Sequence, residues 1–355
     1  MPSRRTTIAS VSAAMISSGA EAKTTIKAVR QVAHGDAKKA IEIVEIPAPV
    51  PAANEVVIAI DAAAMHLADV KFMHGDEGFD YLPLPRFIGT EGVGRIVAIG
   101  KDVKTWKKGD RVFAPMGAGT FRQQLAAPAD KVLAAPKGDA DQLALTTVNG
   151  LTAFLLLEEH VEAKPGDWII QNGANSSVGR YLAVLSKRKG VKTIGLVRRE
   201  SLIAELKAGG ADVVLVDSGD PNDMAAKVKA ATGGVLAKSG IDCVASSATI
   251  TIARCVEDFG KVSNYGFMTG QPCQMSFVDL WKRNIRLHGM NLRTPRSREE
   301  VQQVLTFLAG LIGDGTLHAA IAQTYPLSRI HDALAHQEQS GESRPGKIII
   351  HPNAA

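Results

Sequence analysis

Residues 166–199 constrain the fold of this chain more than any other segment. A short β-type run at 168–171 leads into a turn of small residues, and apolar residues at helical spacing follow from Val178 to Leu185. A second β-type run occupies residues 193–197. Strand, tight turn, helix and strand in this order form the unit that binds the pyrophosphate of a dinucleotide. The segment therefore predicts a nucleotide-binding domain built on a parallel sheet.

The turn at 174–179 is a degenerate form of the G-x-G-x-x-G pattern, because only its last glycine is present. Alanine and serine are still small enough for the backbone to approach a phosphate. Asparagine and serine side chains can add donors beside the helix N-terminus, whose free N–H groups and dipole attract anions. A plain strand-to-helix connection is the alternative interpretation of the turn alone. The predicted cofactor contacts of this turn are Asn175, Ser176, Ser177, Val178 and Gly179.

Two arginines follow the second β-type run and bear on the choice of cofactor. Arg198 and Arg199 stand 19 and 20 positions after Gly179, where an acidic residue would accept the ribose 2′-hydroxyl of NAD. The planar guanidinium matches phosphate geometry, so arginine at this place favours the 2′-phosphate of NADPH. Solvated surface arginines are the alternative. We predict NADPH as the cofactor, with Arg198 and Arg199 on its 2′-phosphate.

Three stretches around this unit resemble one enzyme superfamily. Residues 148–154 read Val-Asn-Gly-Leu-Thr-Ala-Phe, residues 164–168 read Lys-Pro-Gly-Asp-Trp, and residues 170–179 read Ile-Gln-Asn-Gly-Ala-Asn-Ser-Ser-Val-Gly. Together they resemble the medium-chain dehydrogenase/reductase superfamily over roughly residues 25–351. The Gln-Asn pair before the turn and the Asn-Ser pair inside it resemble the branch of trans-2-enoyl-CoA (2-enoyl thioester) reductases. Zinc-free quinone oxidoreductases form a neighbouring branch.

The resemblance implies an α/β fold with two domains. We expect a GroES-like, β-rich catalytic domain at 25–150, a Rossmann domain with a doubly wound parallel sheet that binds NADPH at 151–290, and a return to the catalytic domain at 291–355. A chain of 355 residues with 45% hydrophobic residues can bury two such cores. The active site is expected in the cleft between the domains.

Residues 1–24 are interpreted as a disordered or targeting-like N-terminal tail. Residues 1–22 are rich in Ser, Thr and Ala, contain Arg4 and Arg5, and have no acidic residue before Glu21. A poorly ordered tail in front of a cytoplasmic enzyme is our first interpretation of this composition. A transit peptide that directs the protein to the mitochondrial matrix is the alternative.

Charge, hydropathy and cysteine content exclude several classes of function. The net charge of +5 comes from 41 basic and 36 acidic residues, which is too mild and dispersed for nucleic acid but suits anionic ligands. No apolar run approaches the ~20 residues that span a bilayer. Cys243, Cys255 and Cys273 are too scattered for a disulfide framework, so a reducing compartment fits and small buried residues are the expected role. We predict neither a nucleic-acid partner nor a membrane partner.

The zinc-binding residues of the superfamily's alcohol dehydrogenases have no counterpart in this sequence. Those enzymes carry a cysteine in the segment that resembles 62–69, and a Gly-His-Glu motif where this chain has Gly-Thr-Glu at 89–91. The first cysteine here is Cys243. His66 and His74 lack a third ligand of fitting spacing and are interpreted as surface or pocket histidines. We predict no metal site.

Without a metal, the cofactor carries the chemistry by hydride transfer to an electron-poor carbon. The negative charge that develops on oxygen then needs hydrogen-bond donors and a proton source. In the 2-enoyl thioester reductases a tyrosine donates the proton, and direct counting places Glu77 at its position. Tyr81 would match after a short insertion in the loop, and a packing residue is the alternative for it. Tyr81, Glu77 and water therefore stay open as proton donors.

Other positions match the superfamily directly. Thr152 and Asn149 resemble residues near the nicotinamide and the substrate carbonyl, with a helix-start hydroxyl as the alternative for Thr152. Residues 287–292 resemble a strand at a dimer edge, which implies a homodimer. The resemblance also places six residues against the cofactor, namely Asn172, Gly173, Tyr265, Gly266, Phe267 and Met268.

These observations lead to one predicted function and two alternatives. We predict NADPH-dependent reduction of the C=C bond of α,β-unsaturated carbonyl compounds by hydride transfer without a metal, with 2-enoyl thioesters as the leading substrates. A zinc-free quinone or enone oxidoreductase is the first alternative. A non-catalytic NADPH-binding protein is the second.

Overall fold

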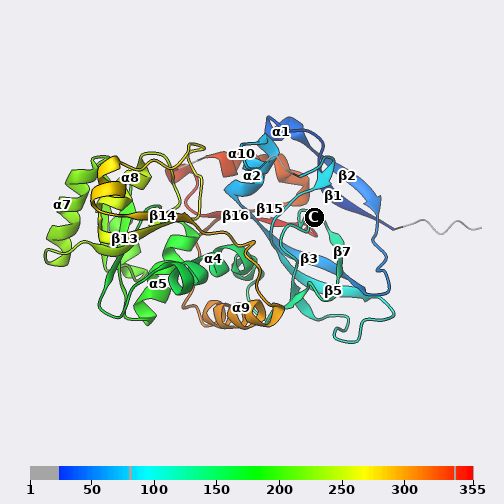
Figure 1. Ribbon diagram of the computed structural model, residues 1–355. Helices are drawn as coiled ribbons and strands as arrows, with labels where there is room; N and C mark the ends of the chain where they lie inside the picture. Colours follow the sequence, from blue (N-terminus) through cyan, green and yellow to red (C-terminus); the bar gives the residue numbers. More distant parts are fainter. Residues whose placement is uncertain (1–23, 80–81, 340, 355) are drawn as a thin grey trace, which may run out of the picture.

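The computed structural model describes residues 24–79, 82–339 and 341–354. Nearly all of the tail expected at 1–24, and Tyr81, lie outside the described residues. The described chain forms two lobes, with the N-terminal strands and the C-terminus in one and the residues around α7 and α8 at the far end of the other (Figure 1).

The first lobe is built on a seven-stranded and a three-stranded β-sheet. The larger sheet consists of β3 (Glu55–Met65), β5 (Val93–Ile99), β6 (Arg111–Phe113), β7 (Gln124–Pro128), β8 (Leu133–Ala134), β15 (Ile321–Pro326) and β16 (Lys347–His351). Its order is β15-β16-β3-β5-β6-β8, with β7 paired to β3. The smaller sheet has the order β2-β1-β4 and consists of β1 (Thr25–Gln31), β2 (Ile41–Pro47) and β4 (Arg86–Phe87).

Short helices cover this lobe and connect it to the rest of the chain. They are α1 (Ala37–Ala40), α2 (Leu67–His74), α3 (Ala140–Leu143), η5 (Leu327–Arg329), α10 (Ile330–Glu338) and η6 (Gly341–Ser343). Apolar side chains of α2 and α10 pack into the same core as those of β3 and β16. Because β16 pairs antiparallel with β3, the end of the chain returns to the sheet of the first lobe.

The second lobe is built on a six-stranded parallel sheet. Its strands are β9 (Trp168–Gln171), β10 (Lys192–Val197), β11 (Val213–Val216), β12 (Ala237–Asp242), β13 (Val256–Asn264) and β14 (Arg286–Gly289). The order β11-β10-β9-β12-β13-β14 reverses direction next to β9, which creates a crevice at the carboxyl ends of β9 and β12.

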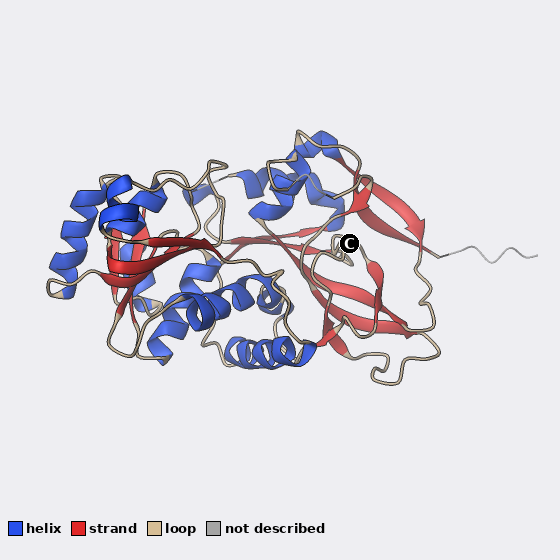
Figure 2. Cartoon of the chain, in the orientation of Figure 1, coloured by secondary structure: helices blue, strands red, loops and turns tan. Residues whose placement is uncertain are grey.

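Helices lie on both faces of this sheet, as Figure 2 shows. One face packs against α7 (Pro221–Thr232) and α8 (Ala248–Arg254), and the other against α5 (Ser177–Arg188) and α6 (Ile203–Ala208), which η3 (Glu200–Leu202) precedes. The turn η4 (Val278–Lys282) leads into β14. Together the two lobes confirm the predicted α/β class, a GroES-like β domain combined with a Rossmann domain.

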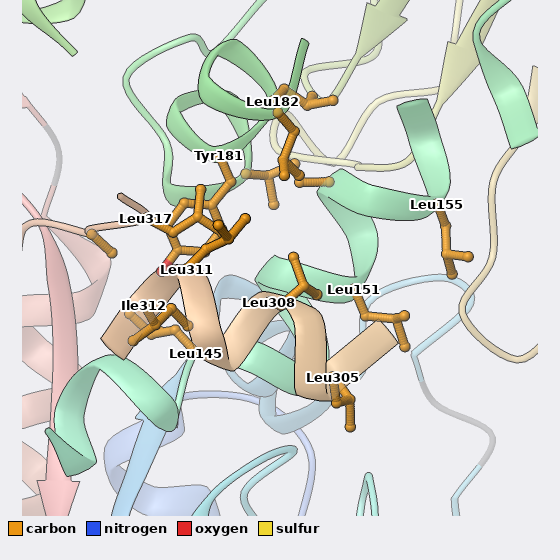
Figure 3. Packing of buried hydrophobic residues seen from close by; sticks show 14 of the residues in the cluster. Leu145, Leu151, Leu155, Tyr181, Leu182, Leu305, Leu308, Leu311, Ile312 and Leu317 are labelled. Carbon is orange, nitrogen blue, oxygen red and sulfur yellow. The ribbon is translucent and has the colours of Figure 1, made fainter. Parts of the chain in front are cut away.

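A single apolar cluster joins the lobes. It is formed mainly by α5, by α9 (Arg298–Gly313) and by the helical segment η1 (Thr146–Gly150), α4 (Leu151–Leu155) and η2 (Leu156–His160). Figure 3 shows four members of this cluster, namely Leu151 of α4, Leu305 and Leu308 of α9, and Tyr181 of α5. Ala62, Val93 and Ile349 of the first lobe's sheet belong to the same cluster, so the two lobes share a packed apolar core.

Candidate active site

The predicted dinucleotide turn connects β9 to α5 at the crevice. Ser176 caps α5, and its Oγ accepts a hydrogen bond of 3.1 Å from the Gly179 N–H. A Cβ at Gly179 would lie 2.7 Å from the Ala174 carbonyl oxygen, so only glycine allows the helix to start this close to the turn. The Val178 side chain packs in the core, which leaves its backbone for a cofactor contact. The small residues of the turn therefore bring α5 close to the end of β9.

Asn172 ties the turn to the neighbouring strand β12. Its Nδ2 donates to Asp242 Oδ1 at 2.6 Å, and its Oδ1 accepts from the Cys243 N–H at 2.9 Å. The Asp242 side chain is fully buried and also accepts from Thr249 Oγ1 at 2.7 Å. The amide of Asn172 thus has a structural role at the strand ends, and its contact with the cofactor stays a prediction.

Cys243 is the residue at which the predicted cofactor segments meet. A Cβ at Gly173, where φ is +57°, would lie 2.5 Å from Cys243 Sγ. On the other side, Met268 Sδ lies 3.6 Å from Cys243 Sγ, and a Cβ at Gly266 would lie 2.6 Å from the Cys243 carbonyl oxygen. Sequence reasoning expected Cys243 only as a small buried residue. Burial indeed raises its pKa to about 12, so it serves as a packing residue of the crevice.

Tyr265 belongs to the same crevice. Burial and the neighbouring Cys243 raise its pKa well above the ordinary value, and a hydrogen bond with Ser176 of the turn lowers it in part. Phe267, two residues later, reaches the first lobe, where Lys71 Nζ of α2 lies 5.1 Å from the centre of its ring. The segment 265–268 therefore extends from the dinucleotide turn to α2 of the first lobe.

A pocket lies at the carboxyl end of β10. Arg199 is half-buried at its wall, and within the described part of the chain its Nη1 has no hydrogen-bond partner. Arg180, also at the wall, is paired with Glu205 at 2.9 Å. Arg198 is exposed and does not line this pocket. The pocket has a volume of about 190 Å³ and is lined by Asn175, Arg180, Arg199, Ser201, Leu202, Glu205, Glu342 and Pro345.

The predicted catalytic residues Asn149 and Thr152 lie on the helical segment that starts the second lobe, and both are buried. Asn149 Nδ2 donates to Glu91 Oε1 at 3.3 Å. The other carboxylate oxygen of Glu91 accepts from Thr147 Oγ1 at 2.7 Å and from the Val148 N–H at 2.8 Å. Glu91, from the first lobe, thus holds the start of this segment, a role that sequence reasoning missed.

Two further residues missed by sequence reasoning complete this cluster. His66 Nε2 lies 2.7 Å from Glu91 Oε1, and Lys347 Nζ of β16 lies 3.2 Å from His66 Nδ1. His66, interpreted from the sequence as a surface or pocket histidine, is only 6% exposed and is therefore not on the surface: it caps α2 from inside the lobe, where its N–H donates to Asp69 Oδ2 at 2.8 Å. One sequence feature could have pointed to this cluster: the charged Lys347 stands directly before three isoleucines at the start of the last strand.

The loop that holds Tyr81 and Glu77 follows α2. Phe79 packs edge-on against Phe72 of α2, with ring centres 5.1 Å apart, and Arg86 lies over the same Phe72 ring at 5.0 Å. These contacts fix both ends of the loop next to α2. Glu77 is exposed, and Tyr81 lies outside the described residues.

Across the described ranges, no three His, Cys, Asp or Glu side chains come together in a way that could hold a metal ion. In the same part of the chain, every helix is too short or too polar to cross a bilayer.

Comparisons with known proteins agree with this geometry. The profile of the family described as "Alcohol dehydrogenase GroES-like domain" matches residues 52–137, and that of the family described as "Zinc-binding dehydrogenase" matches residues 177–310. The mitochondrial enoyl-(acyl-carrier-protein) reductase of Rattus norvegicus is 30% identical over 311 residues, which cover 85% of this chain and 82% of that protein. The chain belongs to the enoyl-(acyl-carrier-protein) reductase family of the medium-chain dehydrogenase/reductase superfamily. The predicted superfamily and branch are thereby confirmed.

Solved structures share the fold of this reductase family. A protein described as a putative NADPH:quinone reductase from Bacillus thuringiensis superposes with a TM-score of 0.84 at 24% identity, covering 92% of this chain and 99% of that one. Etr1p of Candida tropicalis, solved with NADP and crotonyl-CoA, superposes with a TM-score of 0.81 at 23% identity, covering 92% and 100%. At these identities the likeness establishes the fold.

Proposed function

We propose that this protein reduces the C=C bond of 2-enoyl thioesters with NADPH. The observation that carries the proposal is the 30% identity to enoyl-(acyl-carrier-protein) reductases over 85% of the chain. The crevice at β9 and β12, with the predicted segments 172–179 and 265–268 on both sides of Cys243, supports the use of a dinucleotide.

The pocket at the end of β10 supports NADPH rather than NADH. A guanidinium nitrogen that is buried without a partner is costly unless a ligand satisfies it, and a 2′-phosphate would do so with a charge-assisted hydrogen bond. Arg199 would hold this phosphate, with Asn175 and Ser201 as neighbouring donors. Arg198, which is exposed, would contribute through its charge alone. The N-terminus of α5 would attract the pyrophosphate.

We propose that Thr152 and Asn149 orient the nicotinamide and the substrate carbonyl, and that Tyr81 donates the proton. NADPH, when bound, supplies the hydride. Both helix residues lie on the segment that Glu91 holds from the first lobe, so they are fixed at the boundary between the lobes. Phe79 and Arg86, which flank Tyr81 in the sequence, both contact Phe72 of α2, and Lys71 of α2 contacts Phe267 of the cofactor crevice. α2 therefore connects the sequence neighbours of Tyr81 to the segment 265–268.

A zinc-free quinone reductase is the second candidate, favoured by the high TM-score to the protein described as an NADPH:quinone reductase. NADPH oxidation by the purified protein with crotonyl-CoA and, separately, with 1,4-benzoquinone distinguishes the two. We expect a higher kcat/KM for crotonyl-CoA. Turnover of the quinone alone would select the second candidate, and NADPH binding without turnover of either would select a non-catalytic role.

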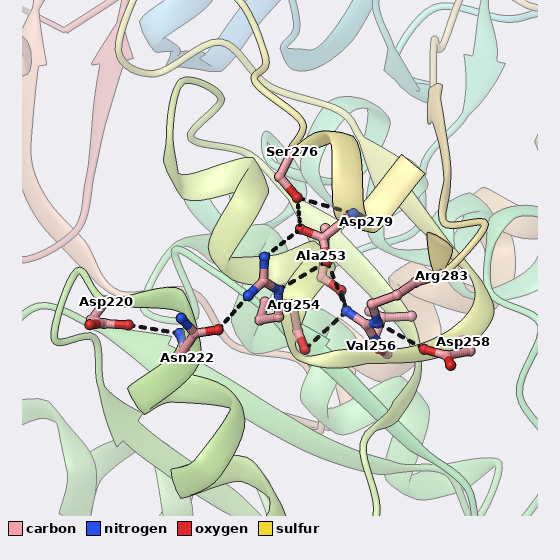
Figure 4. Close-up of polar contacts among 9 residues, drawn as sticks. All are labelled: Asp220, Asn222, Ala253, Arg254, Val256, Asp258, Ser276, Asp279 and Arg283. Atoms are coloured by element: carbon pink, nitrogen blue, oxygen red, sulfur yellow. Dashed lines mark hydrogen bonds and ion pairs between the residues drawn. The ribbon is translucent and has the colours of Figure 1, made fainter. Parts of the chain in front are cut away.

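We further propose a homodimer through the free edge of β14. Phe277 and Trp281 of the neighbouring turn η4 are 71% and 73% exposed, and their rings stack with centres 5.4 Å apart. The buried Asp279 holds η4 in place, because it pairs with Arg254 and with Arg283 at 3.0 Å each (Figure 4). An exposed aromatic surface beside β14, whose outer edge has no partner strand within the described part of the chain, is typical of an interface.

Light scattering after size exclusion tests the dimer. We expect twice the chain mass for the wild type and the single chain mass for Trp281→Glu. Val50→Glu, at an 85% exposed position on the other lobe, is the matched control and is expected to stay dimeric. A monomeric wild type would contradict the proposal.

The names of the relatives place those proteins in mitochondria, which supports the transit-peptide interpretation of residues 1–22 over the cytoplasmic one. Fusion of these residues to a fluorescent protein tests it. We expect mitochondrial fluorescence, and fluorescence spread through the cytoplasm would support the first interpretation.

A further inference from the structure

A chain of three polar groups crosses from the last strand of the catalytic sheet to the first helical segment of the Rossmann lobe. Lys347 Nζ contacts His66 Nδ1 at 3.2 Å, and His66 Nε2 contacts Glu91 Oε1 at 2.7 Å. Glu91 is fully buried and His66 nearly so. None of these residues belongs to the predicted cofactor or catalytic sets. We call them the Lys–His–Glu chain.

The charge on Lys347 determines which nitrogen of His66 carries the proton. An ammonium group can only donate, so His66 Nδ1 must be the acceptor. A neutral imidazole then carries its proton on Nε2 and donates it to the carboxylate of Glu91. Removal of the Lys347 amine takes away the donor to His66 Nδ1, so the ring keeps its hydrogen bond to Glu91 at Nε2 but loses the contact that fixes its orientation from the side of β16.

Glu91 connects the oriented His66 to the predicted active-site residue Asn149. Its second oxygen accepts from Thr147 Oγ1 at 2.7 Å and from the Val148 N–H at 2.8 Å, and its first oxygen accepts from Asn149 Nδ2. These three residues lie in the π-helical turn η1 directly before Thr152. A π-helical turn is strained relative to an α-helix and is common at functional sites. A displaced Glu91 would therefore release η1 and move Asn149.

We propose that Lys347 is a positioning residue of the reductase, which orients His66 so that Glu91 holds Asn149 and the start of the Thr152 helix in place. The inference rests on the proposed function for its kinetic consequences, but the hydrogen-bond chain itself can be tested without activity. Lys347 does not need to touch substrate or cofactor.

The pKa of Lys347 determines the pH range in which the Lys–His–Glu chain contains a charged lysine. Burial lowers it to about 8, while Glu91 and Asp69 raise it and Arg344 lowers it further. His66 lies against Lys347, and Tyr181 of α5 lies near Glu91. Lys347 is thus charged below about pH 8 and neutral above, and its hydrogen bond to His66 Nδ1 is strongest while it is charged.

The kinetic test compares Lys347→Met, which keeps the length of the side chain, with Lys347→Arg, which keeps the charge. With NADPH and crotonyl-CoA at pH 7, we expect Lys347→Met to lower kcat by about 10- to 100-fold, the range for a displaced catalytic group. The wild-type kcat should fall above about pH 8, and this fall should be absent in Lys347→Met. Lys347→Arg should keep most of the activity and show no fall up to pH 10, since arginine does not titrate there.

Thermal unfolding separates positioning from a merely structural role. The lowered pKa means that the unfolded chain binds this proton more tightly, so charged Lys347 reduces stability at pH 7, and the loss disappears as the pH rises through the unfolded value. Lys347→Met should therefore unfold at the wild-type temperature or above it while kcat falls. A structural cross-link would lower both. Lys131→Met, at a 70% exposed lysine, is the control and should change neither.

Nitrogen NMR of ¹⁵N-histidine-labelled protein tests the chain independently of turnover. We expect His66 to show the tautomer with its proton on Nε2 and with Nδ1 as a hydrogen-bond acceptor, and the Nδ1 resonance to shift in Lys347→Met, which lacks the donor. If the wild type reduces no enoyl thioester but shows this tautomer, the proposed function is wrong, whereas the orientation of His66 by Lys347 is supported. A proton on Nδ1 in the wild type, or a Lys347→Met variant with the rate and pH profile of the wild type, would overturn the inference.

Discussion

The pocket at the end of β10 and the buried cluster around Glu91 differ in whether their charged groups have hydrogen-bond partners. At the end of β10, the guanidinium of Arg199 is half-buried with one nitrogen unpartnered among the described residues, beside an open pocket. Near β16, the carboxylate of Glu91 is fully buried and accepts hydrogen bonds from His66, Thr147 and Val148. An unsatisfied charge next to a pocket is suited to binding a ligand, whereas a satisfied charge in a packed interior is suited to holding its neighbours in place. We therefore call the region around Arg199 the binding end and the region around Glu91 the positioning end.

Glu91→Ala breaks the positioning end and has the largest expected effect. The buried donors of His66, Thr147 and Val148 would lose their acceptor, and breaking a buried charged network costs about 3–5 kcal/mol. Urea unfolding measures this loss. Glu45→Ala, at an exposed position of β2, is the control and should change the free energy of unfolding by less than about 0.5 kcal/mol. Equal, small effects of both changes would contradict the positioning role.

Gly173→Ala tests the turn that lies between the two ends. A Cβ there would lie 2.5 Å from Cys243 Sγ at a φ of +57°, so we expect a loss of about 2–3 kcal/mol in the free energy of unfolding. In the double variant with Cys243→Ala, the steric part should be relieved and only the backbone part of about 1–2 kcal/mol should remain. Strict additivity of the two single changes would show that the contact with Cys243 is unimportant.

Arg199→Met tests the binding end and has the smallest effect on the protein itself. Loss of a charge-assisted hydrogen bond should weaken NADPH binding by about 1.5–3 kcal/mol and leave NADH binding nearly unchanged. Isothermal titration with both cofactors measures the difference. Arg198→Met is the matched control and should weaken NADPH binding by less than about 1 kcal/mol, because Arg198 is exposed. An equal loss of affinity for NADPH and NADH would contradict the placement of the 2′-phosphate in this pocket.

The sequence predicted what depends on local pattern. The runs at 168–171 and 193–197 are strands β9 and β10, and the small residues between them form the turn at the start of α5. The sequence predicted the same contact with the 2′-phosphate for Arg198 and Arg199. It could not tell them apart, because the direction in which a side chain leaves the end of a strand depends on the loop that follows. The structure separates them, with Arg199 at the pocket and Arg198 exposed.

The positioning end could not be predicted, because its contacts join distant parts of the chain. His66 meets Lys347 only because β16 pairs antiparallel with the end of β3, where Ile348 lies opposite Met65. Glu91 reaches Thr147 across the boundary between the lobes. No periodicity or motif carries such pairings, so His66 was interpreted as a surface or pocket histidine. Tyr81 as proton donor stays a prediction, since it lies outside the described residues.

Transfer of an isotope label tests the central claim most directly. The purified protein is given crotonyl-CoA and NADPH that carries deuterium at the transferable C4 position, and the product is analysed by mass spectrometry and NMR. Our account predicts butyryl-CoA with one deuterium at C3 and a proton from solvent at C2. Consumption of NADPH without deuterated butyryl-CoA would contradict the account.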